Sequence, residues 1–130
     1  MSIPIAISGT DLIGQARTGT GKTLAFGVSA LQRIVLPGDE GWTQSGSRLP
    51  QALVMCPTRE LALQVSRDID TAARVRGARV LTVYGGVGYD SQIDALQRGV
   101  DVVVGTPGRL LDLVGRRDLN LTSCSIVVLD

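Results

Sequence analysis

The sequence lacks several side chains on which enzymes and nucleic-acid binders commonly depend. Its 130 residues contain no histidine, so the usual general base and the commonest metal ligand are missing. Cys56 and Cys124 are its two cysteines, and two cysteines alone cannot form a zinc site. Aromatic residues make up 3% of the chain and the formal net charge is +1, which excludes the broad basic surface of a stand-alone nucleic-acid binder. Any metal must therefore bind oxygen ligands, and any contact with nucleic acid must be local.

Long hydrophobic runs and targeting signals are missing as well. No stretch of about 18 apolar residues occurs, and the first residues lack the charged and apolar regions of a signal peptide. Both cysteines lie in apolar, strand-like runs, which is typical of inert, buried thiols in a reducing compartment. We therefore expect an intracellular, cytoplasmic protein that does not bind membranes.

The sequence does contain a regular alternation of strand-like and helix-like segments. Short runs rich in valine, isoleucine and leucine indicate strands that are buried on both faces. Apolar residues recur at helical spacing between them, and Thr106 followed by Pro107 predicts the start of a last helix that Gly115 closes. The predicted strands span residues 11–16, 52–56, 79–84, 101–105 and 125–130. Helices follow Lys22, Thr58 and Thr106, and a further short helix contains Ile93 and Leu96 and ends near Gly99. This pattern predicts one domain of the α/β class with a mostly parallel, doubly wound sheet.

The most specific motif lies between the first strand and the first helix, and it is typical of a phosphate-binding loop. Glycines let the backbone bend its amides around a phosphate, and the helix N-terminus attracts the anion. Lys22 can reach the β- and γ-phosphates of ATP, and the Thr23 hydroxyl can ligate Mg²⁺. The strict pattern has glycine at Ala16, so the strand–loop–helix context carries the prediction. The predicted ATP-binding residues are Ala16, Arg17, Thr18, Gly19, Thr20, Gly21, Lys22 and Thr23.

Lysine is used once in this chain, at Lys22, beside twelve arginines. A planar guanidinium cannot replace a compact ammonium among phosphates, so this single lysine also indicates a phosphate site. The last predicted strand ends on Asp130 after four apolar residues, which would place its carboxylate at the edge of the sheet. There it can hold magnesium beside a nucleotide. We therefore predict Lys22 and Asp130 as catalytic residues, and Thr23 and Asp130 as magnesium ligands.

Three further strings follow successive predicted strands. They are Pro57-Thr58-Arg59-Glu60-Leu61-Ala62, Gly85-Gly86 and Thr106-Pro107-Gly108-Arg109. Together with the phosphate loop and the final Val-Val-Leu-Asp, they make the chain resemble the DEAD-box family of ATP-dependent RNA helicases, in particular its bacterial members. The resemblance spans essentially the whole chain. It implies a three-layer RecA-like domain with a phosphate loop, ATP and Mg²⁺ as cofactors, and ATP hydrolysis coupled to RNA duplex remodelling.

The resemblance also implies where RNA binds. All the segments concerned follow the carboxyl ends of predicted strands, where ligands of open α/β sheets bind. Thr58 and Thr106 open helices whose first amides can donate to phosphate oxygens. Contacts with phosphate and sugar would let a nearly neutral, aromatic-poor chain bind RNA without sequence preference. The implied RNA-backbone contacts are Pro57, Thr58, Arg59, Gly85, Gly86, Thr106, Pro107, Gly108 and Arg109.

Two side-chain interpretations accompany these loops. Arg109 could pair with Glu60 to fix two of the loops instead of contacting RNA, and the sequence leaves both possibilities open. Tyr84 and Tyr89 are interpreted as packing residues rather than base-stacking ones.

The chain departs from the family pattern at both ends. It lacks the adenine-reading segment expected before Ile3, for which Gln15 is no substitute, and it lacks the glutamate and the second RecA-like domain expected after Asp130. We therefore expect residues 1–130 to be one partial RecA-like domain of a longer helicase, with negligible RNA-stimulated ATPase activity by itself. The alternative is a non-catalytic nucleotide- or RNA-binding module. A strand expected beside the phosphate-loop strand would be missing too, which predicts an interior gap in the sheet.

Overall fold

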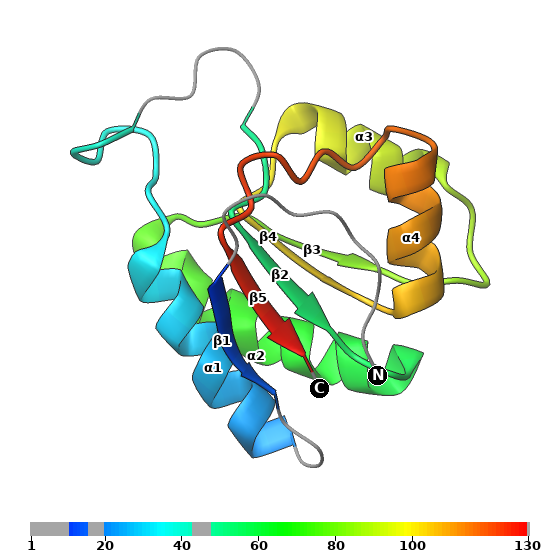
Figure 1. Ribbon diagram of the computed structural model, residues 1–130, viewed down its shortest axis with the longest axis horizontal. Helices are drawn as coiled ribbons and strands as arrows, with labels where there is room; N and C mark the ends of the chain where they lie inside the picture. Colours follow the sequence, from blue (N-terminus) through cyan, green and yellow to red (C-terminus); the bar gives the residue numbers. More distant parts are fainter. Residues whose placement is uncertain (1–10, 16–19, 43–47, 130) are drawn as a thin grey trace.

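Strands and helices alternate strictly along the chain (Figure 1). The computed structural model describes residues 11–15, 20–42 and 48–129. Within these ranges, every predicted strand and helix is present, and the strand ends differ from the predicted ones by one residue. None of the described helices is long and apolar enough to cross a membrane. The elements are β1 (Asp11–Gln15), α1 (Thr20–Arg33), β2 (Ala52–Met55), α2 (Arg59–Arg76), β3 (Val80–Val83), α3 (Asp90–Arg98), β4 (Val102–Gly105), α4 (Pro107–Gly115) and β5 (Ile126–Leu129).

The five strands form one sheet in the order β1-β5-β2-β4-β3, and all neighbouring strands are parallel (Figure 1). Every residue of β2 and β4 is buried, which explains why these strands read as unbroken apolar runs rather than alternating ones. Parallel strands end at the same edge of the sheet, which we call the carboxyl edge. The opposite edge, where the strands begin, is the amino edge.

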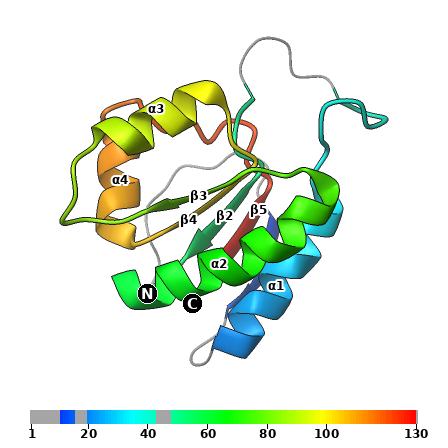
Figure 2. The same cartoon turned by 180° about the vertical axis from the view of Figure 1, so that it is seen from behind.

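Helices cover both faces of the sheet and make three layers, as predicted. Figure 2 shows α1 and α2 crossing one face, while α3 and α4 lie over the other. Alternate strand residues enter the two cores: Val54 and Val104 pack with α1 and α2, and Leu53 and Val103 pack with α4. Burying each such valine or leucine contributes about 1.5–3 kcal/mol, so the two cores together hold the layers in place.

The interior gap predicted beside the phosphate-loop strand is wrong. β1 pairs directly with β5, with Asp11 opposite Ile126 and Gln15 opposite Leu129, although the register shifts between Leu12 and Gly14. β5 pairs with β2 along its other side. The backbone groups of β5 are therefore bonded on both sides, and the two strands that precede the phosphate loop and Asp130 are immediate neighbours.

The ends of the helices follow known capping patterns. Gly77 ends α2 in the left-handed region (φ 76°), where its N–H donates to carbonyls of the last helical turn. Helix α4 ends at Gly115 as predicted, but the residue with positive φ is Arg117 (φ 64°). Arg76, near the end of α2, donates to the carbonyl oxygens of Leu31 and Ile34 and so also caps α1.

An ion pair fastens the long α1–β2 connection to the amino edge. The guanidinium of Arg48 donates to both carboxylate oxygens of Asp101, at 2.8 and 2.6 Å. Asp101 is fully buried and also accepts from the backbone N–H of Arg79, at 2.7 Å. Gln51 adds a second attachment, because its amide oxygen accepts from the N–H of Val35 at 2.8 Å. These contacts stabilise the amino edge, which is opposite the predicted site at the carboxyl edge.

Candidate functional site at the carboxyl edge

The nucleotide half of the predicted site begins where β1 and β5 end. Gln15 and Leu129 are register partners, so the two strands finish side by side at the carboxyl edge. Helix α1 starts at Thr20, five residues after Gln15 ends β1. A strand followed closely by a helix is the arrangement that the predicted phosphate-binding loop requires. Residues 16–19, Asp130 and the side chains of residues 20–23, including Lys22 and Thr23, lie outside what the structure describes. Their assigned roles therefore stay predictions.

The first predicted RNA segment follows β2 and is exposed. Thr58 is the N-cap of α2 in an extended conformation, and its hydroxyl oxygen accepts from the N–H of Leu61 at 3.2 Å. The N–H of Cys56 donates to the carbonyl of Gly105 at 2.9 Å, which continues the ladder between β2 and β4 up to the start of this segment. The guanidinium of Arg59 lies over the ring of Tyr84, 4.7 Å from its centroid. The segment is thus held at its base while Pro57, Thr58 and Arg59 face solvent.

The second segment follows β3 and consists of the two glycines. Gly86 has φ +83°, a conformation that side chains rarely adopt, so glycine is required there. Gly85 has an ordinary φ, and a Cβ on either glycine would meet no described atom within 4 Å. Both residues are exposed. The space in front of this loop is therefore open to a ligand backbone.

The third segment follows β4 and opens α4. The N–H of Thr106 donates to the carbonyl of Val83 at 3.1 Å, which ties this segment to the end of β3. Thr106 is the N-cap residue and Pro107 occupies the first turn, as predicted, but the Thr106 side chain makes no capping hydrogen bond. Helix α4 therefore lacks the side-chain cap that Thr58 gives α2. The first amides of a helix have no partner within it, and here they face the open carboxyl edge.

Arg109 differs from the other residues of these three segments because it is buried, with 8% of its surface exposed. Its guanidinium donates to the amide oxygen of Gln92 at 3.1 Å and to the carbonyl of Val87 at 2.9 Å. It also lies over the ring of Tyr89, 4.1 Å from the centroid. The structure thus pairs Arg109 with the loop after β3 instead of with Glu60, the pairing that the sequence left open.

Tyr89 connects α3 to α4, in agreement with its interpretation as a packing residue. It packs on the core beneath α3 and α4, and the guanidinium groups of both Arg109 and Arg116 lie over its ring. Its hydroxyl donates to the carboxylate of Asp112, and this hydrogen bond raises the pKa of Tyr89. With its ring occupied by arginines, Tyr89 is not available to stack on a base.

Sequence reasoning missed two residues at this edge, Gln92 and Gly105. Gln92 is buried in α3, and the available signal was its position one turn before Leu96 on the apolar stripe of that helix. A Cβ on Gly105 would lie 2.5 Å from the Val83 side chain and 2.8 Å from its carbonyl oxygen. No pattern in the sequence signals this close approach, because it depends on β3 and β4 being neighbours.

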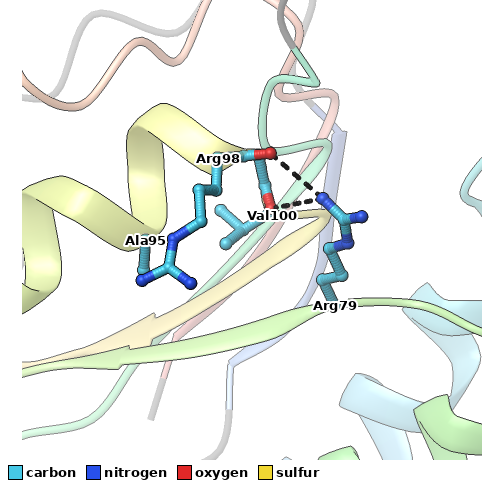
Figure 3. Close-up of a pocket in the computed structure, with 5 residues that line it drawn as sticks. Arg79, Ala95, Arg98 and Val100 are labelled. Atoms are coloured by element: carbon cyan, nitrogen blue, oxygen red, sulfur yellow. Dashed lines mark hydrogen bonds between the residues drawn. The ribbon is translucent and has the colours of Figure 1, made fainter.

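A hollow on the described surface lies at the amino edge, away from all these segments. Its lining includes Arg79, Arg98 and Val100, shown in Figure 3. Arg79 donates to the carbonyl oxygens of Arg98 and Gly99 at 3.0 and 3.3 Å, which caps the end of α3, and Arg98 pairs with Asp94. Both cations therefore have protein partners. Among the described residues, no three acidic or cysteine side chains come together as a metal site.

Comparison with known proteins places this arrangement in a family. The ATP-dependent RNA helicases RhlB of Yersinia pestis (strain Pestoides F) and Yersinia pseudotuberculosis serotype O:3 (strain YPIII) are each 44% identical over 131 residues, which cover 100% of this chain and 30% of theirs. A crystal structure of a hypothetical ATP-dependent RNA helicase from Sulfolobus tokodaii has a TM-score of 0.69 and 38% identity, over 94% of this chain and 32% of that one. This likeness confirms the predicted RecA-like fold, and the chain spans about a third of the length of these relatives. Because the family model for DEAD/DEAH box helicases also matches residues 1–130, the chain belongs to the DEAD/DEAH box helicase family.

Proposed function

We propose that the chain is the ATP-binding part of an ATP-dependent RNA helicase, in which binding and hydrolysis of ATP are coupled to binding and remodelling of RNA. The observation that carries this proposal is the shared carboxyl edge. β1 and β5 end there in register, directly beside the three strands that lead into the predicted RNA segments. A single parallel sheet would hold both ligands at adjoining positions, where the binding of one can affect the binding of the other. The names of the relatives agree with this activity.

ATP would bind between the end of β1 and the start of α1. Helix α1 has 14 residues, so its N-terminus carries a full helix dipole toward the phosphates. In this proposal the backbone of residues 16–21 surrounds the β-phosphate. Lys22 contacts the β- and γ-phosphates as a compact charge.

Magnesium would be held by Thr23 and Asp130. A hydroxyl and a carboxylate are oxygen donors, which Mg²⁺ prefers, and the pairing of Gln15 with Leu129 supports a common location for the two residues. When bound, the ion supplies neutralisation of the charge that develops on the transferred phosphate. Lys22 and Asp130 would thus be the catalytic residues of this lobe.

RNA would bind through its backbone along the ends of β2, β4 and β3. Eight of the nine predicted contacts are exposed or half-exposed: Pro57, Thr58, Arg59, Gly85, Gly86, Thr106, Pro107 and Gly108. Arginine covers the rings of both Tyr84 and Tyr89, which supports contacts with phosphate and sugar rather than base stacking. We further propose that the chain works with a second RecA-like domain and acts in the cytoplasm.

Nucleotide binding tests this proposal. The fluorescent analogue methylanthraniloyl-ATP, with Mg²⁺, is titrated into the wild-type chain and into Lys22→Ala. We expect the variant to bind at least about tenfold more weakly, because it loses a charge-assisted contact to phosphate. Arg67→Ala is the matched control, since it removes an exposed cation from the middle of α2, and its affinity should stay within about twofold of wild type. Equal affinities of Lys22→Ala and wild type would contradict the nucleotide site.

A further inference from the structure

Helix α3 buries one residue fully, and that residue is polar. Gln92 is 4% exposed, whereas its apolar neighbours Ile93 and Leu96 are only partly buried. Burying a side-chain amide is unfavourable unless its oxygen and nitrogen find hydrogen-bond partners. The partners of Gln92 therefore show what its burial achieves.

Both partners of Gln92 lie at the carboxyl edge, one in the first turn of α4 and one at the start of the loop after β3. Its amide oxygen accepts from Arg109 at 3.1 Å, in a contact that is itself buried. Its amide nitrogen donates to the carbonyl of Tyr84 over a longer distance, 3.4 Å. The side chain of Gln92 thus connects the start of α4 with the point where the chain leaves β3.

These contacts extend to all three predicted RNA segments. Arg109 also holds the loop after β3 through the carbonyl of Val87, at 2.9 Å. The ring of Tyr84 carries the guanidinium of Arg59, at the start of α2. One connected set of side chains, centred on Gln92, therefore joins the segments that begin α2, follow β3 and begin α4.

The two glycines of the loop after β3 have open space around them. Gly85 and Gly86 have no described atom within 4 Å of a virtual Cβ, and Gly108 is equally open. The loop of residues 84–89 crosses from β3 to α3 without joining the sheet. The buried pair of Gln92 and Arg109 is a polar anchor beneath this loop, beside the hydrogen bond from Tyr89 to Asp112 at the end of the loop.

We propose that Gln92 is a positioning residue for RNA binding. Together with Arg109 it holds the loop of residues 84–89 against α4, so that the three segments present one continuous surface to the RNA backbone. This inference rests on the proposed function, because it assigns the role of a residue behind the RNA surface. It also gives Arg109 a supporting role, since its guanidinium is directed to Gln92 and Val87.

The test compares Gln92→Leu with Gln97→Leu, an exposed glutamine changed in the same way on the same helix. Leucine keeps the bulk of Gln92 but makes neither hydrogen bond. Three quantities are measured below the melting temperature: the backbone NMR order parameters of residues 85–88, the affinity for a fluorescein-labelled single-stranded oligouridylate, and the affinity for methylanthraniloyl-ATP. A shorter variant, Gln92→Asn, supplies the same readings if the leucine variant does not fold. A further variant, Gln92→Glu, keeps the acceptor for Arg109 and tests rescue.

We expect the order parameters of residues 85–88 to fall in Gln92→Leu while those of β2 and β4 stay at their wild-type values. RNA affinity should fall about tenfold and ATP affinity should stay within about twofold of wild type. Gln92→Glu should recover RNA affinity to within about threefold, and Gln97→Leu should match wild type in every reading.

Unchanged order parameters at residues 85–88 would overturn the inference. So would order parameters that fall equally over the whole domain, or losses of RNA and ATP affinity in parallel, because a residue that acts only on stability gives those results. A wild-type chain that binds no RNA would instead overturn the proposed function, and the order parameters of the loop would still decide whether Gln92 positions it.

Discussion

Gly105 shows how a single missing side chain shapes the carboxyl edge. It ends β4 directly before the third predicted RNA segment, and β3 passes close on one side and α4 on the other. A Cβ at this position would lie 2.5 Å from the Val83 side chain, 2.8 Å from the Val83 carbonyl oxygen and 3.0 Å from Leu110. The Val83 carbonyl belongs to the sheet, and the side chains of Val83 and Leu110 belong to the buried core. Moving any of these groups would disturb close packing and cost free energy.

We therefore expect Gly105→Ala to lower the free energy of unfolding by about 1–3 kcal/mol, the usual cost of overpacking a core. Urea denaturation followed by circular dichroism measures the change. Gly115→Ala is the matched control, because a Cβ there meets nothing within 4 Å and the substitution should stay within about 0.5 kcal/mol of wild type. A Gly105→Ala chain as stable as wild type would show that β3 and α4 do not approach Gly105 so closely.

The buried thiol of Cys124 should make the free energy of unfolding depend on pH in the alkaline range. Burial raises the pKa of its thiol to about 11, although the carbonyl of Ile126 accepts its hydrogen. A cysteine in the unfolded chain has a pKa of about 8.5, so the folded state keeps the proton to higher pH. The resulting stabilisation is complete below about pH 8.5 and is lost as the pH rises toward about 11, by up to about 3 kcal/mol.

The prediction is checked by measuring the free energy of unfolding of wild type and Cys124→Ala from neutral pH to about pH 11. Wild type should lose more stability than the variant over this interval, because only wild type releases the thiol proton on unfolding. Parallel curves for the two chains would contradict the pKa assigned to Cys124.

Among the secondary-structure elements, the strands and helices could be predicted from the sequence, because each depends on a local pattern of residues. Apolar runs and helical spacing were sufficient for every strand and helix, and Pro107 marked the start of α4 correctly. The interior gap expected beside β1 was wrong, because pairing order depends on which strands meet in space and β5 pairs directly with β1. The anchor of the α1–β2 connection was missed as well, since Arg48 and Asp101 are 53 residues apart.

That anchor gives a prediction for the amino edge. In Asp101→Asn, Arg48 loses its carboxylate partner while its guanidinium stays mostly buried, with 15% of the side chain exposed. We expect thermal and urea unfolding to show a loss of about 3 kcal/mol. Asp94→Asn is the control, because its pair with Arg98 is largely exposed and the loss should stay below about 1 kcal/mol. Equal losses in the two variants would show that the buried pair does not hold the connection in place.

In the whole molecule, parallel strands bring the predicted ATP and RNA segments to one edge of the sheet. The positions of the three predicted RNA segments followed from the sequence, because each comes directly after a strand of one parallel sheet. The contacts of Arg109 with Gln92 and Val87, which lie beneath these segments, could not be predicted from the sequence. They form only when α3 and α4 pack on the same face of the sheet. Sequence patterns thus predicted which residues would contact RNA, whereas the packing of α3 and α4 determines which residues support the predicted RNA segments.

The central claim is that one edge of the sheet carries two adjoining sites, for ATP at β1 and β5 and for RNA at β2, β4 and β3. Chemical-shift mapping of the backbone amides tests it most directly, with ATP and Mg²⁺ added in one titration and a single-stranded oligouridylate in another. We expect ATP to shift amides around residues 14–24 and 128–130, and RNA to shift those around 56–60, 84–88 and 106–109. Shifts that cluster at the amino edge, around residues 77–79 and 98–101, or RNA shifts confined to the ATP region, would contradict it.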